Sequence, residues 1–395
     1  MINKILKSNF CLGCGLCSSI IPNQKIIMEL GTNGYYRPIV KQNLSKDDNC
    51  LINNICPGIH VENNLEGGIW GHIEAACQGW SSNKDIRYIA SSGGLVSSIA
   101  IYLLETKQID AILHVGKSEK SSLYNKLLIS RTREQIIERA KSIYAPAQVF
   151  NDIVEILDNS NDNYCFIGKP CDIVAINNLI EQFPKYKRRI RYKISIFCAG
   201  IPSYNATINL CKKSGRTDIP VKIKYRGDGW PGLFEALYED GTKFQMSYIE
   251  SWGRYLGRNL CYRCKICPDG IGLSADLSVG DYWNTKDGYP DFKEQDGRSF
   301  CIIRTPKGKN IIEEAVENNY IEIRDINVKN LKYLQPYQYN RRRLAGWRIL
   351  PIRILSGNML YFKGLSLFKN SLSVPLKEGV IELLGSLKRF QKVNG

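Results

Sequence analysis

The stretch "YCFIGKPCDIVAINNLIEQF", residues 164–183, contains the pattern that decides the fold. Its first five residues form an apolar run of strand length, and from residue 172 onward the apolar side chains recur at helical spacing. A second apolar run of strand type, "YKISIFCAG" at 192–200, follows shortly afterwards. A strand, a helix and another strand in this order predict an α/β core.

The same alternation extends toward the N-terminus. We expect strands at 75–80, 86–90 and 111–116, and helices at 93–108, 133–143 and 147–159. No internal repeat interrupts the pattern, so we assign residues 67–325 to one α/β core.

Two segments of different character flank this core. Residues 1–66 carry a dense group of cysteines, and "KIIMELGTNGYYRPIV" at 25–40 predicts two short strands around an Asn-Gly turn. Residues 326–395 are basic and form amphipathic helical patterns at 339–355 and 379–393. We therefore predict an N-terminal ferredoxin-like segment and a C-terminal helical extension.

The cysteines indicate metal binding. The chain has 14 cysteines and three histidines, and its start lacks the apolar core of a signal peptide, so we expect a cytoplasmic protein with reduced thiols. "CLGCGLC" at 11–17 offers Cys11, Cys14 and Cys17 at the spacing that binds a 4Fe-4S cluster. Ile21 occupies the place of a fourth cysteine, and "ICPGI" supplies Cys56 before a proline as the predicted fourth ligand. Structural zinc on the same four thiols is the alternative, and Cys50 has no clear role.

A second cysteine run, "CYRCKICPDG", contains Cys261, Cys264 and Cys267. Two such runs in one chain favour iron–sulfur electron transfer over a chance pattern or a zinc knuckle. The fourth ligand is expected from Cys198 or Cys171, because both follow predicted strands, where an α/β core places its functional groups.

A possible phosphate site begins at "SSGGLVSS", residues 91–98, where a strand leads into a helix. Ser91 and Ser92 can cap the helix, while Gly93 and Gly94 let an anion approach its free N–H groups. An ordinary helix cap explains the same residues equally well.

The net charge of +16 is typical of proteins that bind nucleic acid or an anionic membrane. Bound cofactors would lower this net charge, because two clusters and a flavin diphosphate carry negative charge that would offset roughly a third of the positive excess. The basic runs at 185–193 and 341–343 lack the interleaved aromatics of nucleic-acid modules, so we predict no nucleic-acid partner. No apolar run is long enough to span a membrane. The run at 185–193 is expected to attract an acidic electron donor such as ferredoxin or flavodoxin.

The order of these motifs, with "FIGKPCDIVAI", "ISIFCAGIPS" and "CYRCKIC…ADLSVGDYW", resembles the coenzyme F(420) hydrogenase/dehydrogenase beta-subunit family over about residues 8–350. The resemblance implies an iron–sulfur flavoprotein that holds FAD, with the "SSGG" helix start as a contact of FAD. It also implies a shared ligand set of Cys171, Cys198, Cys261 and Cys264. Lys169, Ala199 and Cys267 depart from the family pattern, which leaves the fourth ligand open between Cys171 and Cys267.

The predicted function is a reductase or dehydrogenase. Electrons would pass from a ferredoxin-like or deazaflavin donor through two 4Fe-4S clusters to FAD and then to a small organic substrate, and the resemblance extends to polysaccharide or nucleotide-sugar metabolism. Lys169 is the candidate proton donor, because burial near a cofactor lowers the pKa of an amine. An electron-transfer subunit without its own substrate is the alternative, and a homo-oligomer is allowed.

Overall fold

The computed structural model describes residues 1–65, 67–119 and 121–394. The described residues contain an eight-stranded mixed sheet with the order β16-β4-β15-β12-β8-β7-β5-β6. The strands β5, β7, β8 and β12 run parallel in the middle, and antiparallel strands complete both edges. Their bounds are β4 Ala75–Ser81, β5 Ala111–Ser118, β6 Ser121–Ser130, β7 Tyr164–Gly168, β8 Ile190–Ile196, β12 Leu277–Asp281, β15 Ser299–Ile303 and β16 Ile321–Asp325.

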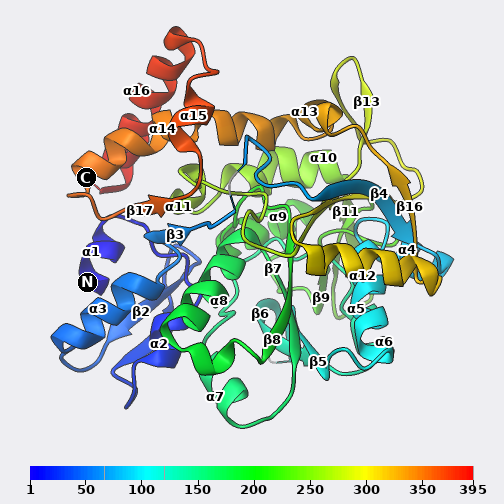
Figure 1. Cartoon of the computed structure of the whole chain (residues 1–395), viewed down its shortest axis with the longest axis horizontal. Coiled ribbons are helices and arrows are strands. Elements are labelled where there is room, and N and C mark those ends of the chain that lie inside the picture. The colour runs from blue at the N-terminus through cyan, green and yellow to red at the C-terminus, as the bar shows by residue number, and fades with distance from the viewer. Residues whose placement is uncertain (66, 120, 395) are drawn as a thin grey trace.

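Helices cover both faces of this sheet (Figure 1). On one face α5 (Leu95–Glu105), α6 (Arg133–Glu138) and α12 (Pro306–Glu317) share a buried apolar cluster with the strands. On the other face α7 (Ile153–Asp158) and α8 (Pro170–Gln182) form a second cluster. Because both faces are buried, the central strands are mainly apolar, as in "YCFIG" of β7. The α/β core is confirmed.

The N-terminal segment and the C-terminal extension pack against each other beside the core (Figure 1). The strand β17 in the extension pairs in parallel with β3 of the N-terminal segment. The N-terminal elements are α1 Ile2–Lys7, α2 Leu16–Ile20, β1 Ile26–Leu30, β2 Tyr36–Val40, α3 Lys46–Ile55 and β3 His60–Glu62. The C-terminal elements are α13 Leu331–Leu334, α14 Pro336–Leu355, β17 Tyr361–Lys363, α15 Leu367–Ser371 and α16 Leu376–Asn394.

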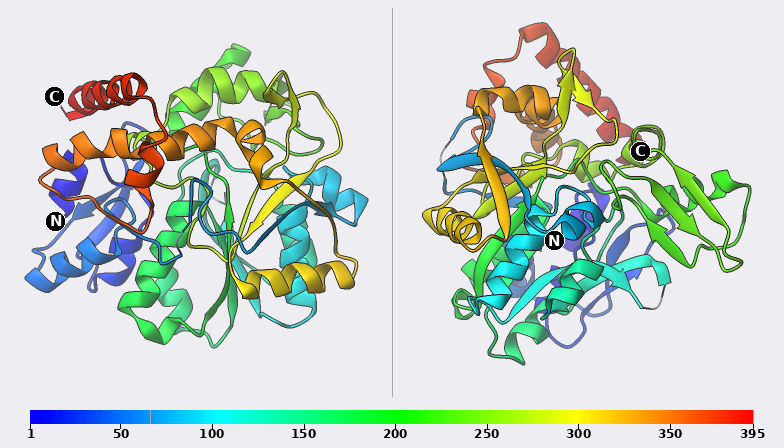
Figure 2. Two further views of the ribbon diagram at one scale, coloured as in Figure 1. Left: turned by 45° about the horizontal axis from the view of Figure 1, so that its top comes forward. Right: turned by 90° about the vertical axis from the view of Figure 1, so that its right-hand side faces the viewer.

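A smaller three-stranded sheet packs on α9 at the side of the core (Figure 2). The bounds of the remaining elements of this region are α9 Tyr204–Cys211, β9 Lys222–Lys224, β10 Phe234–Leu237, β11 Lys243–Met246, α10 Tyr248–Glu250, α11 Tyr262–Lys265, β13 Asn284–Lys286 and β14 Tyr289–Asp291. No described helix combines the length and the apolar character needed to cross a bilayer.

Three local predictions are wrong. Residues 86–90, predicted as a strand, belong to the helix α4 (Lys84–Ile89), because the Asn83 side chain accepts hydrogen bonds from the N–H groups of Asp85 and Ile86 and starts the helix. The helix predicted over 133–143 ends at Glu138. The helix predicted over 147–159 begins only at Ile153, since the Phe150 N–H donates to the Cys14 carbonyl oxygen and holds the preceding residues in turns.

Candidate functional site

The first group of thiols lies in the N-terminal segment. Cys11 and Cys14 lie on the loop before α2, Cys17 lies in that helix, and Cys56 is the residue at which α3 ends. Gly13 permits the tight loop, since its φ is +71° and a Cβ there would lie 2.7 Å from the Tyr36 carbonyl oxygen. The structure thus brings the four predicted ligands together.

Burial and mutual proximity govern these thiols. Burial and, to a smaller extent, the neighbouring Cys11 raise the pKa of Cys56 to about 12. Burial also raises the pKa of Cys17, to which Cys11, Cys14 and Cys56 all contribute. Four half-buried cysteines whose thiols oppose one another's ionisation fit a positively charged iron core, which stabilises thiolates. Cys50 is exposed and stands apart from this group.

The second group of thiols surrounds a small cavity of about 20 Å³ at the carboxyl end of β8. Cys171 lies in the first turn of α8, Cys198 follows β8, and Cys264 and Cys267 come from the run around α11. All four line this cavity. Cys261 lies beside Cys264, but its Sγ faces the Cys11 carbonyl oxygen at 3.7 Å, between the two groups. Five thiols therefore stand near the second site, and four suffice for a cluster.

Buried arginines supply positive charge around both groups. Arg341 donates hydrogen bonds to the carbonyl oxygens of Cys198 at 2.9 Å and Ala199 at 2.6 Å. Arg263 donates to the Gly58 carbonyl oxygen, next to Cys56. A cluster with four thiolates would be anionic, and these cations would balance its charge. In the described residues, no three His, Cys, Asp or Glu side chains converge on the position of a single metal ion.

A cavity of about 350 Å³ adjoins the second group. Its volume falls within the range of small-molecule sites, about 300–1,000 Å³. Cys198, Gly200 and Ile201 line both this cavity and the small thiol-lined cavity. A single short segment after β8 therefore separates the two.

The start of α5 forms part of the wall of the large cavity. Ser91, Ser92 and Gly94 line it, and no side chain caps the helix, which begins after Gly94 with its φ of +71°. Such an uncapped helix start suits a phosphate group. Gly93 is not among the lining residues, because it packs against Gly297 and Arg298, where a Cβ would lie 2.9 Å from the backbone. Ser97, in the first turn, also lines the cavity and adds to the residues predicted for the phosphate site.

Lys169 lines the same cavity in an ion pair with Asp172. Its Nζ donates to both carboxylate oxygens, at 2.6 and 2.7 Å. Burial is the largest single influence and favours the neutral amine, but the charge of Asp172, its hydrogen bonds to Nζ and the nearby thiols Cys171 and Cys198 together outweigh burial and raise the pKa of Lys169. The lowered pKa expected from burial alone is therefore not found.

Aromatic side chains form the wall of the cavity near α10. Tyr144, Tyr248, Trp252 and Trp283 line it together with Arg226 and Asp281. The Arg226 guanidinium pairs with the Asp281 carboxylate at 2.9 and 3.0 Å and lies over the Tyr248 ring. Asp281 and Trp283 end the stretch "ADLSVGDYW", whereas Tyr144, Arg226, Tyr248 and Trp252 lie outside the quoted motifs, because only the fold brings these segments together.

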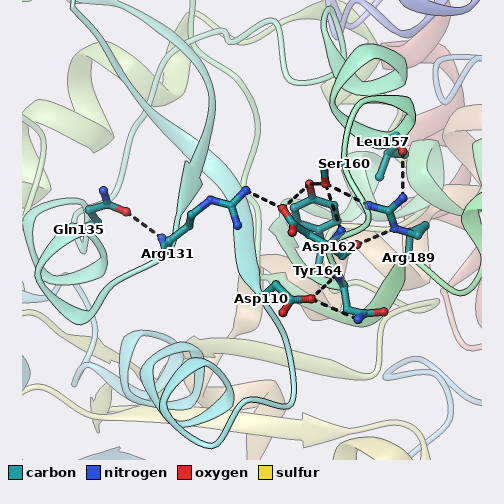
Figure 3. A network of polar contacts seen from close by, with 9 residues as sticks. Asp110, Arg131, Gln135, Leu157, Ser160, Asp162, Tyr164 and Arg189 are labelled. Carbon is teal, nitrogen blue, oxygen red and sulfur yellow. Dashed lines mark hydrogen bonds and ion pairs between the residues drawn. The ribbon is translucent and has the colours of Figure 1, made fainter.

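The two basic runs are largely structural. Arg341 and Arg342 are buried and donate to backbone carbonyl oxygens, while Arg343 pairs with Glu378. In the run at 185–193, Arg189 donates to Leu157, Ser160 and Asp162 (Figure 3). Lys193 donates to Asn177, and Lys185 pairs with Asp158. Of the run at 185–193, Lys185, Lys187, Arg188 and Arg191 are exposed, and among these Lys185 is paired with Asp158.

Comparisons with known proteins agree with this arrangement. The family model for the N-terminal part of the coenzyme F420 hydrogenase/dehydrogenase beta subunit matches residues 76–153. The family model for the C-terminal part of the same beta subunit matches residues 161–329. Both matches leave out the N-terminal thiols.

The curated relatives and this chain match over only part of their lengths. The chain is 23% identical to the coenzyme F420-dependent sulfite reductase of Methanocaldococcus jannaschii over 86% of its own length, but it spans 50% of that relative. It is 26% identical to the coenzyme F420 hydrogenase subunit beta of Methanococcus voltae, covering 65% of this chain and 86% of the relative.

A solved structure shares the fold. A chain in the F420-reducing [NiFe] hydrogenase complex of Methanosarcina barkeri matches with a TM-score of 0.55 and 20% identity, covering 71% of this chain and 94% of that one. The two family models together span more than half of the sequence, in the order that the motifs predict. The protein belongs to the coenzyme F420 hydrogenase/dehydrogenase beta-subunit family.

Proposed function

We propose that this protein is an electron-transfer oxidoreductase that holds two 4Fe-4S clusters and one FAD and reduces or oxidises a small organic substrate. Clusters of this kind carry single electrons, and a flavin combines two of them into a hydride equivalent. Cys11, Cys14, Cys17 and Cys56 would hold the N-terminal cluster. The second would take its ligands from Cys171, Cys198, Cys261, Cys264 and Cys267.

The position of Cys198 carries this proposal. Cys198 lines both the thiol-lined cavity and the large cavity. A redox centre bound by Cys198 would therefore adjoin any group that fills the large cavity. Cys261 lies between the two groups of thiols. Its position supports a path in which electrons pass from the N-terminal cluster to the second cluster and then to the large cavity.

The remaining parts of the large cavity suit a flavin and a substrate. The uncapped start of α5 would bind the diphosphate through backbone N–H groups, with Ser92 and Ser97 beside it. Lys169, protonated and paired with Asp172 at the cavity wall, stays the proposed catalytic residue, but its raised pKa suits a fixed positive charge beside the flavin or the substrate better than a proton donor. A role in polysaccharide or nucleotide-sugar metabolism and a cytoplasmic location stay predictions.

A subunit of a larger complex, without its own substrate, is the second candidate. The names of several relatives favour it, because they are beta subunits of hydrogenases and formate dehydrogenases. The electron donor would then be a partner subunit in place of a free ferredoxin or flavodoxin.

A reductive titration under anaerobic conditions tests the proposal. Two clusters and a flavin take up about four electrons per chain, with bleaching of both the flavin and the cluster absorbance. The variant Ser97→Glu places a carboxylate at the proposed diphosphate site and should take up about two electrons, with its flavin lost. Glutamate in a first helical turn stabilises the helix itself, so loss of α5 would not explain this result.

Ser97→Ala is the matched control and should keep the flavin. Uptake of two electrons by an iron-free wild type would contradict the proposal. So would equal flavin content in the Ser97→Glu and Ser97→Ala variants.

A further inference from the structure

The helix α16 carries a row of apolar residues on its outer side. Leu376, Val380, Ile381 and Leu384 follow one another at helical spacing, and their exposed fractions run from 41% for Val380 to 72% for Leu376. Phe368 and Leu372, which precede the helix, are exposed to 79% and 70%. In both views of Figure 2, α16 lies at the edge of the molecule. We call the four helix residues with Phe368 and Leu372 the C-terminal apolar face.

The inner side of α16 contacts α14 and the N-terminal segment, which leaves the outer side exposed. Glu378 pairs with Arg343 at 2.6 Å, and Glu382 pairs with Arg348 at 2.8 Å. The Phe390 ring lies 6.3 Å from Phe10, beside the first cysteine of the N-terminal group. The outward direction of the apolar row follows from these contacts.

The charge around the apolar face has one sign. Residues 336–395 contain eleven lysines and arginines and two glutamates, and both glutamates are engaged in the ion pairs with α14. Lys377, Lys388 and Lys392 are exposed on α16, and Lys369 is exposed on α15. Apolar residues thus lie between lysines that face the solvent.

We propose that this face binds the surface of an anionic lipid bilayer. Apolar side chains on one side of a helix enter the boundary between headgroups and acyl chains, and flanking lysines attract anionic headgroups. A second copy of the chain fits less well, because it would bring two lysine-rich faces together. Nucleic acid would leave the apolar row in water. When the protein is bound in this way, the N-terminal group of thiols lies close to the lipid surface, because Phe390 of α16 packs on Phe10.

Sedimentation with lipid vesicles tests the proposal. The anaerobically purified protein should sediment with vesicles of mixed phosphatidylcholine and phosphatidylglycerol, and weakly or not at all with phosphatidylcholine alone. Ile381→Glu with Leu384→Glu should weaken binding by on the order of 100-fold, because two buried apolar side chains are lost. Lys388→Glu with Lys392→Glu should weaken it by at least about tenfold.

Matched controls distinguish binding through the C-terminal apolar face from binding through the overall positive charge of the protein. Ile219→Glu changes an apolar residue of similar exposure, 63%, far along the chain, and should bind as the wild type does. Lys243→Glu is the control for charge. Equal binding of all variants, or no binding of the wild type to anionic vesicles, would overturn the proposal. A dimer that Ile381→Glu dissociates, or binding to DNA without binding to vesicles, would also overturn it.

Discussion

At the scale of single residues, Cys198 joins the parts of the site. It follows β8 at the carboxyl end of the parallel strands, where α/β sheets place their ligands. The sequence could predict its candidacy from that position alone. The choice among the five thiols of the second group was not predictable, because it depends on how α8 and the 261–267 run meet in space.

The assignment of Cys56 as the fourth ligand of the N-terminal group can be tested by replacing Cys56 and, as a control, Cys50 of the neighbouring helix α3. Cys56→Ser should lower the iron content from about eight to about four per chain and leave the flavin bound. Cys50→Ser should change neither, because Cys50 is exposed on α3. Anaerobic iron and flavin analysis gives the result. Loss of iron from the Cys50 variant, with none from the Cys56 variant, would show that the assignment is wrong.

His114 makes stability depend on pH. Burial and Arg139 lower the pKa of His114 to about 4, and its Nε2 lies 2.7 Å from the Ser130 Oγ. Because the unfolded chain binds this proton more readily, stability should fall as the pH drops from about 6.5 to about 4, by up to roughly 3 kcal/mol.

Denaturant midpoints measured across this range should therefore be flatter for His114→Gln than for the wild type. His72→Gln, at a half-exposed histidine, is the control and should keep the slope of the wild type. If the stability of His114→Gln and of the wild type changed with pH in parallel, His114 would not be the cause of the loss of stability at low pH.

At the scale of elements, the sequence pattern predicted the strands and helices whose apolar periodicity is long, such as β7, α8 and α14. It failed at residues 86–90, because a cap from Asn83 outweighs a short apolar run. It also failed at 147–152, where packing against the cysteine loop replaces a helix. Both failures have tertiary or capping causes that a periodicity does not contain.

The helix α14 binds distant loops through a buried arginine. Arg342 donates to the carbonyl oxygens of Ile69, Pro268 and Leu365, and it is 1% exposed. Arg342→Met keeps the apolar stem and leaves three carbonyls without this donor, so it should lower the free energy of unfolding by about 3 kcal/mol or more.

Arg343→Met is the neighbouring control on the same helix. It removes one ion pair with Glu378, at the protein surface, and should cost about 1 kcal/mol or less. Urea unfolding under anaerobic conditions compares the two variants. An Arg342 variant no less stable than the Arg343 variant would refute the role of Arg342.

At the scale of the whole molecule, the two ends of the chain meet. They share a buried apolar cluster, and β17 pairs with β3 (Figure 1). The predicted division at residues 66 and 326 stays a prediction. The contact between its outer parts could not be predicted, because it joins segments about 300 residues apart with no sequence signal in common.

The exposed residues of the run at 185–193 remain the proposed docking point of an acidic donor. Lys185 pairs with Asp158 at the end of α7, and the Val154 N–H of the same helix donates to the Ser19 Oγ of α2. The run is thus connected through α7 to the helix that carries Cys17. Lys187→Glu with Arg188→Glu should slow reduction by ferredoxin several-fold at low salt.

Reduction by dithionite should be unaffected by the same double variant, as should reduction by ferredoxin at high salt. Lys212→Glu with Lys213→Glu is the matched reversal at another exposed pair. Stopped-flow bleaching of the cluster absorbance measures both donors. Equal slowing with dithionite, or none with ferredoxin, would place the docking surface elsewhere.

The central claim is that this one chain holds two iron–sulfur clusters at two separate groups of thiols. Iron, acid-labile sulfide and zinc, measured per chain after purification without oxygen, test it most directly. Two clusters correspond to about eight irons and about eight sulfides per chain, with no stoichiometric zinc. Stoichiometric zinc with no iron would contradict it.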